Sequence, residues 1–227
     1  MTEEIIKTRV EDEKHPLEQV SFFGVWKYGR TYLNIVYMIL LMPLGIFYFT
    51  YAVTLFSTFV GLLVTCIGIF LLYFFLITLP YFMLAQGWLM RVFVGIELPK
   101  QEVDIAEDRT FIQKSFDALK SKVIWKSLLY FLFIAMPLGI ITFTLTVTLI
   151  STGLGLTFAW LAPLIEYAVE GSTLDYPWVI SSTVRILMII GYAITPFIGI
   201  PVLTGTLHLN NRLSIYHGRL IVRILKK

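Results

Sequence analysis

The sequence predicts an all-α membrane protein with four transmembrane helices, built as a direct repeat of two helical hairpins with short amphipathic or interfacial helices added. Of the 227 residues, 57% are hydrophobic and 15% are charged, whereas soluble domains carry about 25% charged residues. Three long stretches contain no charged residue and no histidine, namely 31–84, 127–165 and 186–207. Because about 20 apolar residues cross a bilayer, these stretches are long enough for four spans.

The sequence contains an internal repeat. Residues 42–61 read MPLGIFYFTYAVTLFSTFVG and residues 136–155 read MPLGIITFTLTVTLISTGLG, with 13 of 20 positions identical. The identities fall on Pro, Gly, Ser and Thr as well as on common apolar residues, so shared composition alone does not explain them. A self-similar segment of this kind indicates a repeated supersecondary unit, which here is a membrane hairpin.

The elements follow in order along the chain. The first 30 residues are polar and lack the apolar core of a cleaved signal peptide. The spans are expected at 31–56, 61–85, 126–150 and 184–207. The expected segments are a cytoplasmic N-terminal segment 1–30, a first hairpin 31–85, a cytoplasmic connection 86–125, a second hairpin 126–207 and a basic cytoplasmic C-terminal segment 208–227.

The distribution of basic residues predicts the orientation. Every Lys and Arg except Arg185 lies before the first span, between the second and third spans, or after the fourth. Basic residues beside short loops stay in the cytoplasm. We therefore expect a multi-pass protein of the cell membrane with both termini cytoplasmic.

The second hairpin carries an insertion of 27 residues, near 156–182. Its apolar part is too short to span comfortably, so we expect an outer-leaflet or re-entrant helix that ends at Gly171. Counting residues 153–168 as a fifth span would place the basic C-terminus outside, which disfavours that alternative.

A Pro-Leu-Gly motif occurs in the first and third spans, as Pro43 with Gly45 and Pro137 with Gly139. Proline removes one helical hydrogen bond, and glycine lets another helix approach closely. The motif is either a pair of hinges that transmits a signal or a pair of static kinks that shapes the bundle, and the kink is favoured.

A stripe of small hydroxyl residues follows each motif at helical spacing. Its members are Thr50, Thr54 and Ser57 in the first copy and Thr144, Thr148 and Ser151 in the second. A polar ligand track is one interpretation. Packing of one repeat against the other is favoured, because small residues allow close helix contact.

The outer segment carries a candidate polar cluster, consisting of Glu166, Glu170, Asp175 and Arg185. These carboxylates lack the spacing of a calcium loop, so a solvated loop is favoured over a cation or ligand site.

Other chemistry-bearing residues form no recognisable motif. His15, His208 and His217 are scattered, and Asn210 and Asn211 stand at the inner end of the fourth span. We find no metal-ligand or nucleophile–base pattern and no phosphate loop, so no enzyme, cofactor or metal is expected. Residues 109–126 show the pattern of an amphipathic helix, suited to an anionic leaflet or to a partner.

The chain resembles the four-helix putative sensor domains found at the N-terminus of some actinobacterial and archaeal sensor histidine kinases and as stand-alone membrane proteins. The resemblance lies in YMILLMPLGIFYFTYAVTLFSTFVGLLVTCIGIFLL, RVFVGIELP, YFLFIAMPLGIITFTLTVTLISTGLGL and LDYPW, and covers roughly residues 25–220. It implies a signal-input role. No phosphoacceptor-histidine helix or ATP-binding domain accompanies these segments, so output is expected to pass to a separate protein.

The sequence thus predicts a non-catalytic membrane signal-input protein. One alternative is a small transporter or transporter subunit, but such proteins usually keep ionisable groups in the membrane, and the three uncharged stretches argue against it. The other alternative is a structural membrane partner. The expected partners are the lipid bilayer and a cytoplasmic or membrane signalling protein, with a homodimer left open and nucleic acid not expected.

Overall fold

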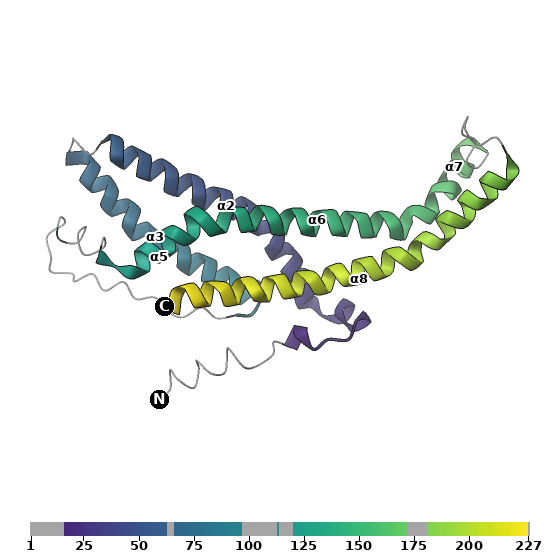
Figure 1. The fold of residues 1–227 in the computed structure, drawn as a ribbon, viewed down its shortest axis with the longest axis horizontal. Helices are drawn as coiled ribbons and strands as arrows, with labels where there is room; N and C mark the ends of the chain where they lie inside the picture. The colour runs from purple at the N-terminus through teal and green to yellow at the C-terminus, as the bar shows by residue number, and fades with distance from the viewer. Residues whose placement is uncertain (1–15, 63–65, 97–112, 114–119, 172–180, 227) are drawn as a thin grey trace.

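The computed structural model describes residues 16–62, 66–96, 113, 120–171 and 181–226 (Figure 1). These residues form helices and no strand. Two short 3-10 helices, η1 (Pro16–Glu18) and η2 (Phe23–Lys27), precede the long helices α2 (Gly29–Gly61) and α3 (Cys66–Phe93). Four helical segments among the described residues are long and apolar enough to cross a membrane, which confirms the predicted all-α class and the four spans.

The second half of the chain is a longer hairpin. The helix α5 (Lys122–Leu129) continues through a π-helical segment η3 (Tyr130–Ala135) into α6 (Met136–Phe158). A 3-10 turn η4 (Ala159–Leu161) and the short helix α7 (Ala162–Glu170) follow. The helix α8 (Ser182–Lys226) returns, antiparallel to α6 (Figure 1).

Helix ends follow local sequence. Gly171 adopts a left-handed conformation and ends α7, as its position after the apolar run predicts. Gly95 is also left-handed, and the backbone N–H groups of Val94 and Gly95 both donate to the carbonyl oxygen of Met90. Even a methyl group at Gly95 would collide with the guanidinium of Arg30, so the start of α2 is packed against the end of α3.

The two hairpins cross at their Pro-Leu-Gly motifs. An added methyl group at Gly45 would lie 2.6 Å from the carbonyl oxygen of Ala135, and one at Gly139 would lie 2.5 Å from the carbonyl oxygen of Leu41. Leu41 and Ala135 occupy equivalent positions of the sequence repeat, as do Gly45 and Gly139. The contact is therefore reciprocal, and both glycines let backbone touch backbone. The internal repeat of the whole hairpin stays a prediction from the sequence.

The hairpins splay apart from this crossing. Contacts run from Leu41 with Gly139 to Tyr48 with Phe131, whose rings lie 4.5 Å apart, so α2 and α6 run in opposite senses here. In Figure 1 the tip of the α2–α3 hairpin lies at the upper left and that of the α6–α8 hairpin at the upper right. Even so, α2 packs more extensively against α6 of the other hairpin than against its own partner α3.

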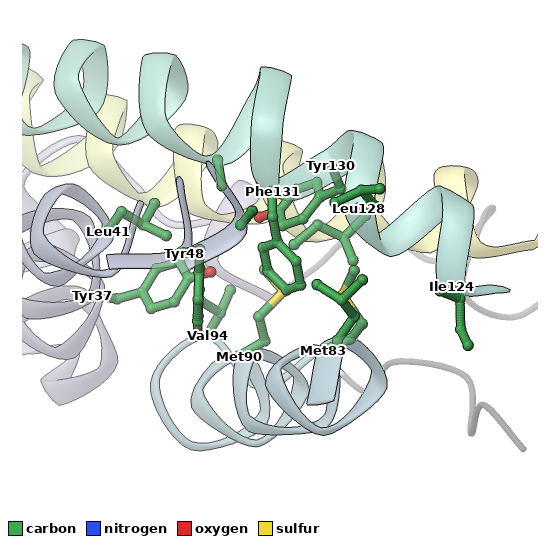
Figure 2. Packing of buried hydrophobic residues seen from close by; sticks show 14 of the residues in the cluster. Tyr37, Leu41, Tyr48, Met83, Met90, Val94, Ile124, Leu128, Tyr130 and Phe131 are labelled. Atoms are coloured by element: carbon green, nitrogen blue, oxygen red, sulfur yellow. The ribbon is translucent and has the colours of Figure 1, made fainter. Parts of the chain in front are cut away.

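The core lies where the bases of the hairpins meet. Figure 2 shows side chains of α2, α3, α5 and η3 converging there. Phe131, Met90 and Ile124 are fully buried, and Phe131 also contacts Phe82 edge-on. The crossing thus anchors a packed base from which the two apolar tips extend.

Candidate functional site

The base of the bundle holds one buried imidazole between two tyrosines. The Tyr37 hydroxyl lies 3.0 Å from Nδ1 of His217, and the Tyr130 hydroxyl lies 2.9 Å from its Nε2. All three side chains are at most 2% exposed. We call His217, Tyr37 and Tyr130 the clamp. It joins α2 of the first hairpin and η3 of the second to the distal part of α8.

The clamp extends into a chain of amide and hydroxyl groups. Gln86 of α3 donates from Nε2 to the Tyr37 oxygen at 3.0 Å, and the Tyr48 hydroxyl lies 3.5 Å from Gln86 Oε1. A neutral imidazole has one donor and one acceptor, so one clamp tyrosine donates to His217 and the other accepts from it. The two tautomers exchange these roles.

A second polar group lies one to two turns nearer the hairpin tip along α8. Asn34 donates from Nδ2 to Oδ1 of Asn211 at 2.8 Å, and Asn211 donates to the Thr31 hydroxyl at 3.0 Å. Thr146 of α6 donates to Oδ1 of Asn210 at 2.6 Å. Both hairpins are therefore tied to the same helix by hydrogen bonds.

This second group is not fully satisfied. Among the described residues, Asn34 Oδ1 and Asn210 Nδ2 are buried without a hydrogen-bond partner. An unpaired buried polar atom costs about 1–3 kcal/mol, so these two atoms offset part of the stability that the hydrogen bonds of this group contribute.

The sequence did not identify these residues as a site. His217, Asn210 and Asn211 were expected in a cytoplasmic segment after a span that ended near residue 207, whereas α8 continues without a break to Lys226. The available signal was their spacing, because Asn210, Asn211, Ser214 and His217 recur on one face of a continuous helix, and all four are buried. His208 lies outside this face and contacts the Phe22 carbonyl.

The predicted hinge and packing residues divide into two groups. Gly45 and Gly139 are buried at the crossing, whereas Pro43 and Pro137 are exposed beside it. Pro43 lies inside continuous α-helix, and Pro137 follows the π-helical segment. The six hydroxyl residues of the stripe are exposed rather than packed between the repeats: Thr50, Thr54, Ser57, Thr144, Thr148 and Ser151.

The face on which the stripe lies explains why it is open. Its residues are on the opposite side of α2 from the buried Ala52, and on the opposite side of α6 from the buried Thr142 and Thr146. Contact beyond the crossing is made instead by another face of α6, on which Thr142, Thr146 and Gly153 are buried. An added methyl group at Gly153 would lie 2.7 Å from the Leu203 side chain of α8.

The outer polar cluster is only partly described. Glu166 of α7 and Arg185 of α8 are half-buried, and α7 packs near the start of α8. The Asp175 position and the Glu170 side chain lie outside the described residues, as does most of the predicted amphipathic helix 109–126. No group of three His, Cys, Asp or Glu side chains in the described part of the chain could hold a metal ion.

Comparison with known proteins identifies the family. The family described as "Putative sensor" matches residues 37–225, a range that contains both Pro-Leu-Gly motifs, the crossing and the clamp. No curated protein and no solved structure matches the chain. Because the match covers most of the sequence, the chain belongs to the Putative sensor family.

Proposed function

We propose that the protein is a non-catalytic membrane signal-input protein that acts through a separate cytoplasmic or membrane partner. Family membership and the four membrane-compatible helices support a sensor role. The observation that carries the proposal is the clamp, because one side chain of α8, His217, is bonded to both hairpins. A change in the angle between the hairpins must alter at least one of these bonds.

The proposed orientation places both termini in the cytoplasm of a multi-pass cell-membrane protein. The distribution of basic residues supports it, because every Lys and Arg except Arg185 lies before the first predicted span, between the second and third, or after the fourth, and basic residues beside short loops stay in the cytoplasm. Under this orientation the stimulus acts on the spans from the outer face or within the bilayer. In this orientation the clamp and the end of α8 lie toward the cytoplasmic side, where a cytoplasmic partner can bind.

The crossing suits a change of angle. The helices touch through glycine, so no side chain stands between their backbones at the contact. The two hairpin tips point in different directions (Figure 1), so a ligand or a change in bilayer thickness can act on them separately. Small rotations at the crossing would then change the hydrogen bonds between His217 and the two clamp tyrosines.

The test uses a photoreactive amino acid at Tyr216 of α8, which neighbours His217 and is 59% exposed. Phe197, 78% exposed in the apolar part of the same helix, is the matched control site. In native membranes we expect Tyr216 to cross-link a discrete protein, with a yield that changes at least twofold in a Tyr37→Phe variant. Cross-links to lipid alone at both sites, or a protein cross-link that ignores the clamp variant, would contradict the proposal.

A further inference from the structure

The two clamp tyrosines stand at different positions of the repeat, and the π-helical segment Tyr130–Ala135 begins at the second of them. Tyr37 stands six residues before Pro43, whereas Tyr130 stands seven residues before Pro137. The repeat equivalent of Tyr37 is therefore Phe131, yet it is Tyr130 that binds His217. A π-helical turn accommodates one extra residue relative to an α-helix, so it brings Tyr130 to the position that Tyr37 occupies in the first copy.

The first copy shows what the same motif does without the extra residue. Helix α2 runs as regular α-helix through Pro43, so proline alone does not impose a π-helical turn. The turn in the second copy is associated with the hydrogen bond at its first residue, Tyr130, and with the backbone contact at its last residue, because Ala135 lies against Gly45. The segment thus links the clamp directly to the crossing.

We infer that Tyr130–Ala135 is a register switch with two positions. In the observed register the extra residue holds Tyr130 on His217. In the other register the segment is α-helical, α5 turns by one residue position about its axis, and Phe131, which has no hydroxyl, replaces Tyr130 beside the imidazole. Its role as the output step rests on the proposed function, but the two registers are tested without any partner or ligand.

The geometry sets the size of the movement. One residue of an α-helix corresponds to a rotation of about 100°. At a side-chain radius of about 5 Å this moves a surface residue of α5 by about 8 Å. The α2–α8 contacts, including the bond between Asn34 and Asn211, do not involve η3 and stay in place.

A pair of single-residue deletions tests the extra residue. Phe133 and Ile39 are equivalent in the repeat, and both are exposed, but only Phe133 lies in the π-helical segment. Deletion of Phe133 places Tyr130 six residues before the proline, as Tyr37 is. We expect this variant to keep its melting temperature within a few degrees in detergent, while deletion of Ile39 rotates the start of α2 and unfolds the protein. Equal damage, or equal tolerance, would overturn the inference.

Spin labels test the second register. In a Cys66→Ser background, labels at Lys122 of α5 and Arg212 of α8 report rotation of α5, and labels at Tyr32 and Arg212 are the reference pair. The double substitution Tyr130→Phe with Phe131→Tyr moves the hydroxyl to the residue that faces His217 in the α register. We expect the first distance to shift by roughly 5–8 Å and the reference distance to stay unchanged.

Tyr37→Phe is the matched control for this experiment. It removes the other hydroxyl from the same imidazole but lies in regular α-helix, so no rotation of α5 is expected. An unchanged Lys122–Arg212 distance in the swapped variant would overturn the switch, whatever the deletions show. Rotation in the Tyr37→Phe control as well would also overturn it, because the movement would then not depend on register.

Discussion

Replacement of the crossing glycines by alanine should separate the two hairpins. The added methyl group at Gly45 lies 2.6 Å from the Ala135 carbonyl oxygen and 3.0 Å from the Met136 Cα, and ordinary contact begins near 3.4 Å. The obstructing atoms are backbone, which cannot rotate away. The helices must therefore move apart by about 0.8 Å at the crossing, which loosens the packed base around it.

Two effects determine the magnitude. Overpacking of this kind costs about 1–3 kcal/mol, whereas Gly→Ala in a helix interior contributes about 1 kcal/mol of helix stability. Gly155→Ala is the matched control, since nothing lies within 4 Å of a methyl group there and only the helix-propensity gain applies. We expect Gly45→Ala and Gly139→Ala each to be about 1–3 kcal/mol less stable than this control.

The reciprocal contact adds a sharper expectation. One separation of the helices makes room for both methyl groups, so the double variant should cost clearly less than the sum of the two single variants. The assay is reversible unfolding in mixed micelles, or thermal unfolding in detergent, with the five proteins side by side. If Gly45→Ala and Gly139→Ala are as stable as Gly155→Ala, the glycine crossing is not the contact between the hairpins.

Three further outcomes can be measured with the same preparation. Thr146→Val removes the donor to Asn210 and should cost about 1–3 kcal/mol, whereas Thr148→Val on the exposed stripe should change stability by no more than about 0.5 kcal/mol; similar values for the two would contradict the burial described here. Asn211→Leu removes the hydrogen-bond partner of Asn34 and of Thr31 and should lower the free energy of unfolding by about 1–3 kcal/mol. Adding Asn34→Leu and Thr31→Val should restore part of this stability, and no restoration would argue against this hydrogen-bonded group. In a Cys66→Ser background, cysteine at Arg223 should be protected from an impermeant thiol reagent in intact cells and cysteine at Tyr167 should be labelled; labelling at Arg223 would contradict the proposed cytoplasmic position of the C-terminus.

The spans were predictable because a membrane leaves a strong one-dimensional signal. Long uncharged runs need no knowledge of tertiary contacts, and the structure has four segments that meet the criterion. The helix end at Gly171 was also predictable, since glycine readily adopts the left-handed conformation observed there. These features depend on neighbouring residues in the chain.

The angle between the hairpins was not predictable from the repeat. The duplicated motif indicates that Gly45 and Gly139 have equivalent surroundings, but it does not fix whether the helices lie side by side or splay. Packing of the hydroxyl stripe between the repeats was favoured because small residues allow close helix contact. In the structure the helices meet through other faces, and Thr50 and Thr144 are exposed.

The clamp was missed because its members are far apart in sequence and belong to no catalytic pattern. Tyr37 and Tyr130 are ordinary residues of apolar spans, and His217 stands beyond the expected end of the last one. The π-helical turn is equally invisible in a local reading. It becomes apparent only when the spacing of Tyr130 from Pro137 is compared with that of Tyr37 from Pro43.

The most direct test of the account is nitrogen NMR of the protein labelled at histidine, reconstituted in lipid. The chain has three histidines, and a His217→Gln variant assigns the resonances of the clamp. We predict that Tyr37→Phe shifts chiefly the Nδ1 resonance of His217 and that Tyr130→Phe shifts chiefly its Nε2 resonance, with His208 unaffected by either. If neither substitution changes the His217 resonances, the imidazole is not held between the two hairpins and the account fails.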